Sequence, residues 1–363
     1  MITIFGALGL GETAATTVTS IGQQVVYDGI QAVFDAYNED VQALAGFFIQ
    51  RSTSDYQIKY KLPGGGRLQR RGRQSVPGEV KGGSDWTVQF PLEDFGASMG
   101  LDDITLSYAT LGDVDVLVRT IQIQDLTTLR AEILRAIFNK AARPFKDELK
   151  GDLTIQPLAN GDATLYPPVA GSEDVATSNH YLGVASAATT FNDANNPIPT
   201  IVSALEAHFG APSGGSNIVI LINPAQSRSV KGLADFVPVA QHFVSYGENV
   251  SLALEQLFPE GLPPGRVIGV SDGAIVVEWL NCPAGYMAGF HLDAPKPLIR
   301  RLDPESTGIP AGLHLFGQNS DAPLLRASYR NRYGLGCGNR LNGVIVDLTA
   351  ATPNQYTTPA IFA

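Results

Sequence analysis

The sequence is poor in charge and has no long apolar run. Charged residues make up 17% of its 363 residues, against about 25% in an average soluble protein. A membrane-spanning helix needs roughly 20 consecutive apolar residues, and no run of this sequence approaches that length. The first basic residue is Arg51, whereas a secretory signal begins with positive charge. We therefore expect neither a membrane span nor a secretory leader.

Residue types that bind metals or form covalent links are scarce. The two cysteines, Cys282 and Cys337, are isolated and form no C-x-x-C motif, so the sequence suggests neither a disulfide framework nor a thiolate zinc site. The five histidines are scattered, and no pair has the i, i+4 spacing of a zinc-binding helix. The net charge of −10 argues against a protein that holds DNA along a basic face. The sequence predicts no metal and no cofactor.

Two G-x-S-x-G matches are the only catalytic motif of note. They span Gly96–Gly100 and Gly269–Gly273. A nucleophile elbow needs a strand before the serine and a helix directly after it. The first match leads into an expected strand at Ile104–Tyr108, and the second lies in an expected hairpin turn. We therefore predict that the protein is not an enzyme, and a hydrolase using Ser98 or Ser271 is kept as an alternative.

A long basic loop is predicted between two strands. Apolar residues alternate with polar ones over 56–62 and again over 86–90, as in half-buried strands. Between them lie the 22 residues of Pro63–Ser84, seven of them glycine. Residues 51–90 hold eight basic and three acidic residues. Loops of this length seldom lack a function in compact domains.

We predict that this extended loop docks on a neighbouring copy of the chain, against the acidic segments 1–50 or 151–197. A solvated loop and a nucleic-acid patch are the alternatives, although interleaved aromatics for the second are missing. The residues predicted to make the inter-subunit contact are Arg67, Arg70, Arg71, Arg73, Trp86, Val88 and Phe90.

Hydrophobic periodicity predicts the other elements. An extended arm over 1–20 precedes a helix from Ile21 to about Gln50, and a second long helix covers Val116–Leu149, with Pro144 kinking or restarting it. An α/β section follows. Its predicted elements are the helix Pro199–Phe209, the strand Asn217–Ile222, a helix start at Asn223-Pro224, the helix Val250–Phe258 and a hairpin over Arg266–Trp279. Strands return at Leu325–Tyr333 and Val344–Val346.

The order of these elements resembles the major capsid proteins of tailed bacteriophages. Their fold is the Hong Kong 97-type capsid fold, which encapsulin shells share. The stretches that carry the resemblance are Asn217–Pro224, Arg266–Arg301 and Arg326–Gly334. The resemblance covers most of the chain as an architecture, without a single diagnostic motif.

The resemblance implies an α+β fold with five parts. These are an N-terminal arm and helix (1–53), an extended β-hairpin loop (54–95), a peripheral domain with a spine helix (96–150), an axial α/β domain (151–318), and returning strands with a C-terminal tail (319–363). Residues outside the loop have no implied catalytic or binding role.

The resemblance also implies a function. The chain would self-assemble as pentamers and hexamers into an icosahedral shell around the double-stranded DNA of a tailed phage. It would be made in the host cytoplasm and reside in the virion. Because the arm begins near Met1, a separate scaffolding protein or none is implied, together with a portal and room for a decoration protein. DNA would be enclosed without sequence-specific binding, and no membrane is involved. An encapsulin-like compartment with an enzyme cargo is the alternative shell.

Overall fold

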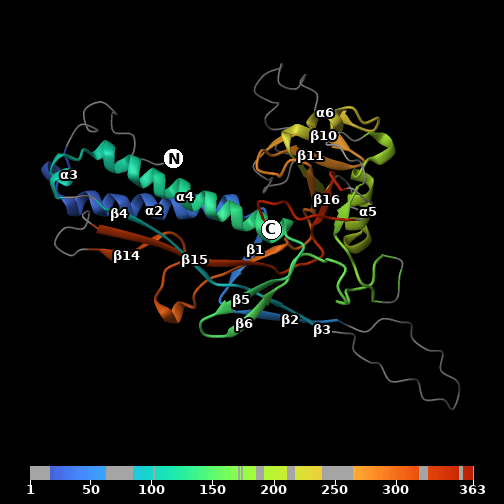
Figure 1. Cartoon of the computed structure of the whole chain (residues 1–363), viewed down its shortest axis with the longest axis horizontal. Helices are drawn as coiled ribbons and strands as arrows, with labels where there is room; N and C mark the ends of the chain where they lie inside the picture. Colours follow the sequence, from blue (N-terminus) through green and yellow to red (C-terminus); the bar gives the residue numbers. More distant parts are fainter. Residues whose placement is uncertain are drawn as a thin grey trace, which may run out of the picture.

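The computed structural model describes residues 17–62, 85–100, 103–170, 172, 175–184, 192–210, 217–238, 265–318, 326–350 and 355–362. Figure 1 shows two regions joined side by side: an elongated one in which long helices lie along a sheet, and an α/β region that carries the second sheet. A narrow hairpin extends beneath both. The predicted helix Val250–Phe258 and the loop Pro63–Ser84 lie outside the described residues.

Two long helices cover one face of the first sheet. The elements of this region are α1 (Val18–Ile21), α2 (Gln23–Ala45), α3 (Asp103–Tyr108), α4 (Leu111–Phe138), β1 (Ile49–Thr53), β4 (Glu93–Gly100), β13 (Leu298–Arg301), β14 (His314–Gln318) and β15 (Arg326–Cys337). The sheet order is β1-β13-β15-β14, and β4 also pairs with β15. Apolar residues of α2 and α4, among them Ile30, Phe34 and Val118, bury against Tyr329 of β15. The predicted helix from Ile21 to about Gln50 is thereby confirmed as far as Ala45, whereas its expected end is wrong, since Ile49 and Gln50 belong to β1.

The helix α4 differs from the predicted helix at both ends. It begins after Thr110, whose hydroxyl accepts a hydrogen bond from the Asp113 amide at 3.3 Å, while the Asp113 carboxylate accepts one from the Thr110 amide at 3.0 Å. This capping box fixes the first turn. The helix ends at Phe138, since Asn139 takes an extended conformation with φ −82° and ψ 115°. Pro144, which cannot donate a backbone hydrogen bond and restricts the residue before it, disfavours any continuation of the helix to Leu149. Pro144 lies instead in β5 (Arg143–Asp147), which pairs with β6 (Gly151–Ile155).

The predicted strand Ile104–Tyr108 is wrong, since these residues belong to the helix α3. A short run of mixed apolar and polar residues fits both the period of a helix and the period of a strand. Here Ile104 and Tyr108, which are four residues apart, are both exposed, and the helix turns the chain from β4 into α4.

The second sheet is buried on both faces. Its strand order is β7 (Tyr181–Gly183), β16 (Val344–Asp347), β12 (Tyr286–His291), β8 (Ile218–Ile222), β11 (Ala274–Glu278), β10 (Arg266–Ser271) and β9 (Val237–Pro238). In β8, Ile218, Ile220 and Ile222 face the helices α5 (Ile198–Phe209) and α6 (Ser227–Lys231). Val219 and Leu221 face the core shared with the end of α4. Double burial explains the unbroken apolar run of this strand.

Most local predictions for the α/β region are confirmed. The helix α5 ends at Phe209, and Gly210 follows with φ +79°. The side chain of Asn223 accepts a hydrogen bond from the Ala225 amide at 3.0 Å at the start of a 3-10 turn, Pro224–Gln226. The turn between β10 and β11 places Asp272 and Gly273 at φ 49° and 75°, as a two-residue hairpin requires. Two further 3-10 turns are Asp193–Asn195 and Glu305–Thr307.

Candidate functional site

The hairpin predicted around the basic loop is present. Strands β2 (Gln57–Lys61) and β3 (Asp85–Gln89) are antiparallel, with Ile58 opposite Val88 and Tyr60 opposite Trp86. In Figure 1 the hairpin runs beneath β5 and β6 and points away from the helical region. An isolated two-stranded hairpin is marginal in water, so its stability depends on what its inner face contacts.

The inner face of the hairpin packs on its own chain. The ring of Trp86 stacks on Tyr60 at 5.1 Å between centroids and meets Tyr166 edge-on at 5.6 Å. Val88 and Phe90 are almost completely buried with Ile299 of β13. The apolar side chains therefore fasten the hairpin to the body of the same subunit.

A buried ion pair holds the end of β3. The Arg301 guanidinium donates to the Phe90 carbonyl at 2.9 Å and to the Asp147 carboxylate at 2.7 Å. Burial acts to raise the pKa of Asp147, yet hydrogen bonds from the Leu149 amide and from Arg301 outweigh it, so the pKa lies below its usual value. The carboxylate is therefore charged at neutral pH and ties β5, β13 and the hairpin together.

Glycines let the long strand β15 cross the hairpin closely. A methyl group on Gly334 would overlap the carbonyl group of Pro91. One on Gly336 would lie 2.8 Å from the ring of Phe90. At both positions the absence of a side chain permits the contact. The Thr154 amide also donates to the Gln89 side chain at 2.6 Å, which joins β6 to β3.

Arg340 organises the loop beneath Trp86. Its buried guanidinium donates to the carbonyls of Pro157 and Leu158 at 2.7 and 3.3 Å and to the Asp162 carboxylate at 2.8 Å. It also lies 5.7 Å from the centroid of the Tyr166 ring. This one side chain therefore fixes the loop that presents Tyr166 to the hairpin.

The predicted contact residues separate into two groups. Val88 and Phe90 are covered by their own chain, and Trp86 is half-buried on its own Tyr166. The four arginines, Arg67, Arg70, Arg71 and Arg73, lie outside the described residues. Their inter-subunit contact stays a prediction. Sequence reasoning did not find Arg301, Asp147 or Arg340, since neither spacing nor composition marks a charge that pairs across the fold.

Neither G-x-S-x-G serine sits on a nucleophile elbow. Ser98 is exposed in the middle of β4, opposite Ser328. Ser271 is buried at the end of β10, beside a hairpin turn. Burial raises the pKa of Cys337 to about 12 and that of Cys282 still further, which keeps both thiols protonated. Within the described ranges no group of three histidine, cysteine or acidic side chains is placed to hold a metal ion.

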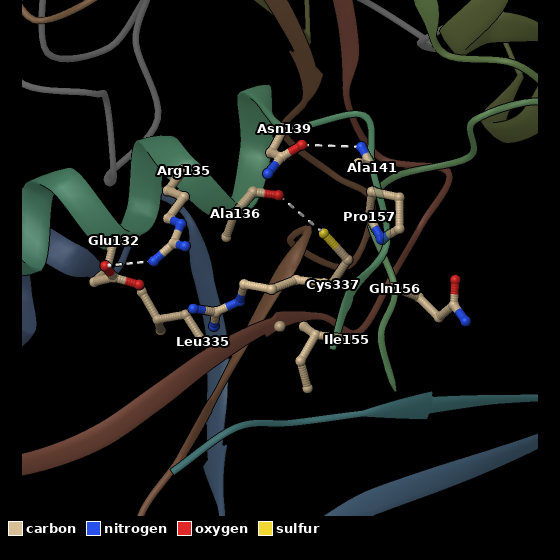
Figure 2. A pocket seen from close by; sticks show the side chains of 12 residues that line it. Glu132, Arg135, Ala136, Asn139, Ala141, Ile155, Gln156, Pro157, Leu335 and Cys337 are labelled. Atoms are coloured by element: carbon tan, nitrogen blue, oxygen red, sulfur yellow. Dashed lines mark hydrogen bonds and ion pairs between the residues drawn. The ribbon is translucent and has the colours of Figure 1, made fainter. Parts of the chain in front are cut away.

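The cavity beside the end of α4 is small. Figure 2 shows Glu132 and Ala136 of α4, and Asn139 directly after the helix, facing Leu335 and Cys337 of β15 across it. Its volume is about 30 Å³, which matches one water molecule and not the several hundred Å³ of a substrate pocket. A wider, open groove of about 860 Å³ is lined in part by Asp303 and Glu305, which come after β13 in the sequence. Among the described residues that line it there is neither a histidine nor a cysteine. No described helix is both long and apolar enough to cross a bilayer.

Comparison with known proteins shows similarity at the level of the fold. No family model matches the chain, and no curated protein does so. A solved structure from Mycobacterium phage Patience covers 97% of this chain and 94% of its own, with a TM-score of 0.68 and 17% identity. The asymmetric unit of the bacteriophage PhiM1 mature capsid has a TM-score of 0.49 and 14% identity, over 84% of this chain and 86% of its own. The capsid of a native GTA particle has a TM-score of 0.45 and 12% identity, over 85% and 91%.

The TM-score of 0.68 at 17% identity to the Mycobacterium phage Patience structure describes a shared architecture and not a shared sequence. The chain has the tailed-phage major capsid protein fold, of the Hong Kong 97 type.

Proposed function

We propose that the protein is the subunit of an icosahedral shell, assembling as pentamers and hexamers around the double-stranded DNA of a tailed phage. The observation that carries this proposal is the hairpin. Its base is fixed to the subunit by Trp86, Val88, Phe90 and the Arg301–Asp147 pair, and beyond it the sequence continues into a basic, glycine-rich stretch. A firmly held base with an unusually long loop is suited to reaching another molecule.

A division of the chain into five parts goes with this proposed function. We assign residues 1–53 to an arm and helix, 54–95 to the extended loop, 96–150 to a peripheral domain, 151–318 to an axial domain, and 319–363 to returning strands and tail. In such a shell many weak, repeated contacts replace one tight site, and arms that overlap a neighbour add buried area to each contact.

The net charge of the chain supports a shell that encloses DNA more than a protein that binds DNA along its surface. The chain carries −10 net charges, so the bulk of its surface repels nucleic acid. The basic residues of the loop would meet acidic segments of a neighbouring copy, where complementary charge sets register and specificity. A scaffold, a portal and a decoration protein are further partners that a phage shell of this kind would use.

The loop provides the decisive experiment. In one variant Asn-Gly joins Leu62 directly to Ser84, a turn that suits a two-residue hairpin, and in a second Arg67, Arg70, Arg71 and Arg73 become glutamine at full loop length. Sedimentation velocity and negative-stain electron microscopy should show shells, or rings of five or six, for the natural chain. Both variants should keep its melting temperature within a few degrees but fail to close shells.

Each outcome of that experiment has a consequence. Normal shells from the shortened variant would contradict the docking role of the loop. A natural chain that stays monomeric even with a scaffolding protein would contradict the shell itself. DNA inside particles isolated from infected cells supports the phage capsid, whereas an enzyme cargo would point to an encapsulin-like compartment.

A further inference from the structure

Three of the five histidines meet where α5 ends. His180 directly precedes β7, His208 lies in the last turn of α5, and His291 ends β12. The rings of His180 and His208 are 5.2 Å apart, and the Phe209 ring lies 6.4 Å from His208 and 5.6 Å from His291, between centroids. We call His180, His208 and His291 the histidine seam.

The surroundings of the histidine seam favour the uncharged form of the imidazole rings. His180 is 1% exposed, its Nδ1 lies 2.8 Å from the Gly343 carbonyl, and its Nε2 has no hydrogen-bond partner among the described residues. Both ring nitrogens of His291 are likewise buried without a partner in the described part of the chain. His208 shares one hydrogen bond, of 3.1 Å, with the Ser178 hydroxyl. A buried ring without partners strongly disfavours the charged form.

The charged groups that face the seam do not compensate this burial. Burial lowers the pKa of His180 to about 4, helped by His208 and Arg340, and burial also lowers the pKa of His208. Asp293 and Glu206 face His291 and act to raise its pKa, but burial outweighs them. All three rings are therefore neutral at pH 7, and protonating His180 would place a positive charge near both His208 and Arg340.

The seam is joined to the hairpin through one small cluster. Phe209, next to His208, and Trp86 of the hairpin both pack against Ala159, Tyr166 and Leu341. The backbone adds to this link, because the His180 amide donates to the Ala159 carbonyl at 2.7 Å and the Ala170 amide donates to the Ala207 carbonyl at 2.7 Å. Any displacement of the end of α5 must therefore disturb the loop on which Trp86 rests.

We propose that the histidine seam is an acid-sensitive clasp that holds the end of α5 against the loop supporting the hairpin, and that its protonation frees the base of the hairpin. The inference concerns the single chain and does not rest on the proposed shell. Because the pKa values of these histidines are lower in the folded chain than the usual 6.5, the stabilisation is complete above about pH 6.5 and is lost progressively as the pH falls toward 4. In a shell, this clasp would make the angle of the hairpin depend on pH.

Tryptophan fluorescence measures the state of the clasp. The chain has two tryptophans, so the variant Trp279→Phe leaves Trp86 as the only emitter. Between pH 6.5 and 4, its emission should shift to the red while far-UV circular dichroism retains its helical signal. A triple variant, His180→Asn, His208→Gln and His291→Gln in this background, should lose that shift. The side-chain amide that His180→Asn introduces would still offer a donor to the Gly343 carbonyl.

The matched control is His314→Gln. His314 lies on β14 in the other region of the fold, with its own contact to the Gly312 carbonyl at 2.9 Å, and its replacement should leave the pH response unchanged. An unchanged shift in the triple variant would overturn the proposal, as would a Trp86 shift that always coincides with loss of the helical signal.

A second measurement covers the case in which Trp279→Phe fails to fold. Hydrogen–deuterium exchange of the natural chain, corrected for the intrinsic effect of pH, should rise together in peptides covering 198–210 and 85–90 as the pH falls below 6.5. Exchange that stays flat in both peptides, or rises in only one, would contradict the coupling.

Discussion

Single charged residues decide whether the hairpin is held. Arg301 and Asp147 are each about 6% exposed and 2.7 Å apart, and the same guanidinium also binds the Phe90 carbonyl. Two charges taken out of water repay their desolvation only when each is fully hydrogen-bonded. Asp147 meets that condition, since it also accepts hydrogen bonds from two backbone amides at 2.9 Å, whereas Nε of Arg301 has no partner among the described residues.

Replacing Arg301 by methionine should therefore be costly. The variant leaves a buried carboxylate without its countercharge, for which we expect a loss of about 3 kcal/mol in the free energy of unfolding. Arg266→Met is the control, because its ion pair with Glu278 has the same 2.7 Å distance but Arg266 is exposed, and such pairs contribute less than about 1 kcal/mol. Urea unfolding of both variants gives the comparison. Equal losses would contradict the structural role assigned to Arg301.

For single residues, the sequence indicated which face of a strand a side chain occupies, but not which residues cover that face. Alternation correctly placed Trp86, Val88 and Phe90 on one side of a strand. It could not say which chain covers that side, because burial against the same subunit and burial against a neighbour leave the same pattern. The contacts of Arg301 were equally impossible to predict from the sequence, since its partners Asp147 and Phe90 are far from it along the chain.

Among the elements, β15 has the most demanding packing. Its first part lies between β4 and β14, and its last part pairs with β13. Where it passes the end of the hairpin, Gly334 leaves no room for a side chain against the Pro91 carbonyl. Backbone on both sides of this contact leaves little scope for relaxation.

Gly334→Ala tests that contact. The added methyl group must displace backbone, and we expect a loss of about 3 kcal/mol or more in the free energy of unfolding, at the upper end of the cost of overpacking. Gly151→Ala is the matched control: it has open space around it and φ +79°, so only the backbone conformation is penalised, by about 1 kcal/mol. Thermal and urea unfolding measure both. A milder effect at Gly334 than at Gly151 would show that β15 can move away from the hairpin.

Element prediction succeeded where local chemistry dominates. The caps at Asn223 and Gly210 and the turn at Asp272-Gly273 depend on neighbouring residues and were identified correctly. It failed at Ile104–Tyr108, a segment too short to distinguish the two periods. The end of α4 was also misplaced, since the helix stops before the proline by pairing Arg143–Asp147 with β6.

For the whole molecule, the sequence supplied the order of elements but not the order of strands. The similarity to a phage structure over 97% of the chain confirms the fold expected from that order. Neighbouring strands such as β8 and β11, or β16 and β7, are distant in sequence, and no local signal records such pairing. The net negative charge of the molecule, by contrast, follows from composition alone.

A net charge of −10 predicts that the protein does not bind free duplex DNA. Neutralising phosphates requires a basic surface whose counterion release drives binding, and the basic stretch at 51–90 is outweighed by the rest of the chain. In a gel-shift experiment at about 0.15 M salt, micromolar protein should leave linear DNA unshifted. A histone-like basic protein of similar size is the positive control. A shift that weakens with added salt would contradict this expectation.

The pairing of β1 with β13 has a consequence for the time at which the chain completes its fold. Ile49 lies beside Leu298, and Tyr181 lies beside Ile345, so neither sheet can close until most of the chain has been translated. At about 5–20 residues per second, β1 waits on the order of tens of seconds for its partner, and pairings this remote close slowly even afterwards. If the chain forms the proposed shell, nascent chains on a polysome would therefore lack the finished surfaces that the shell needs, and the pace of translation would separate synthesis from assembly.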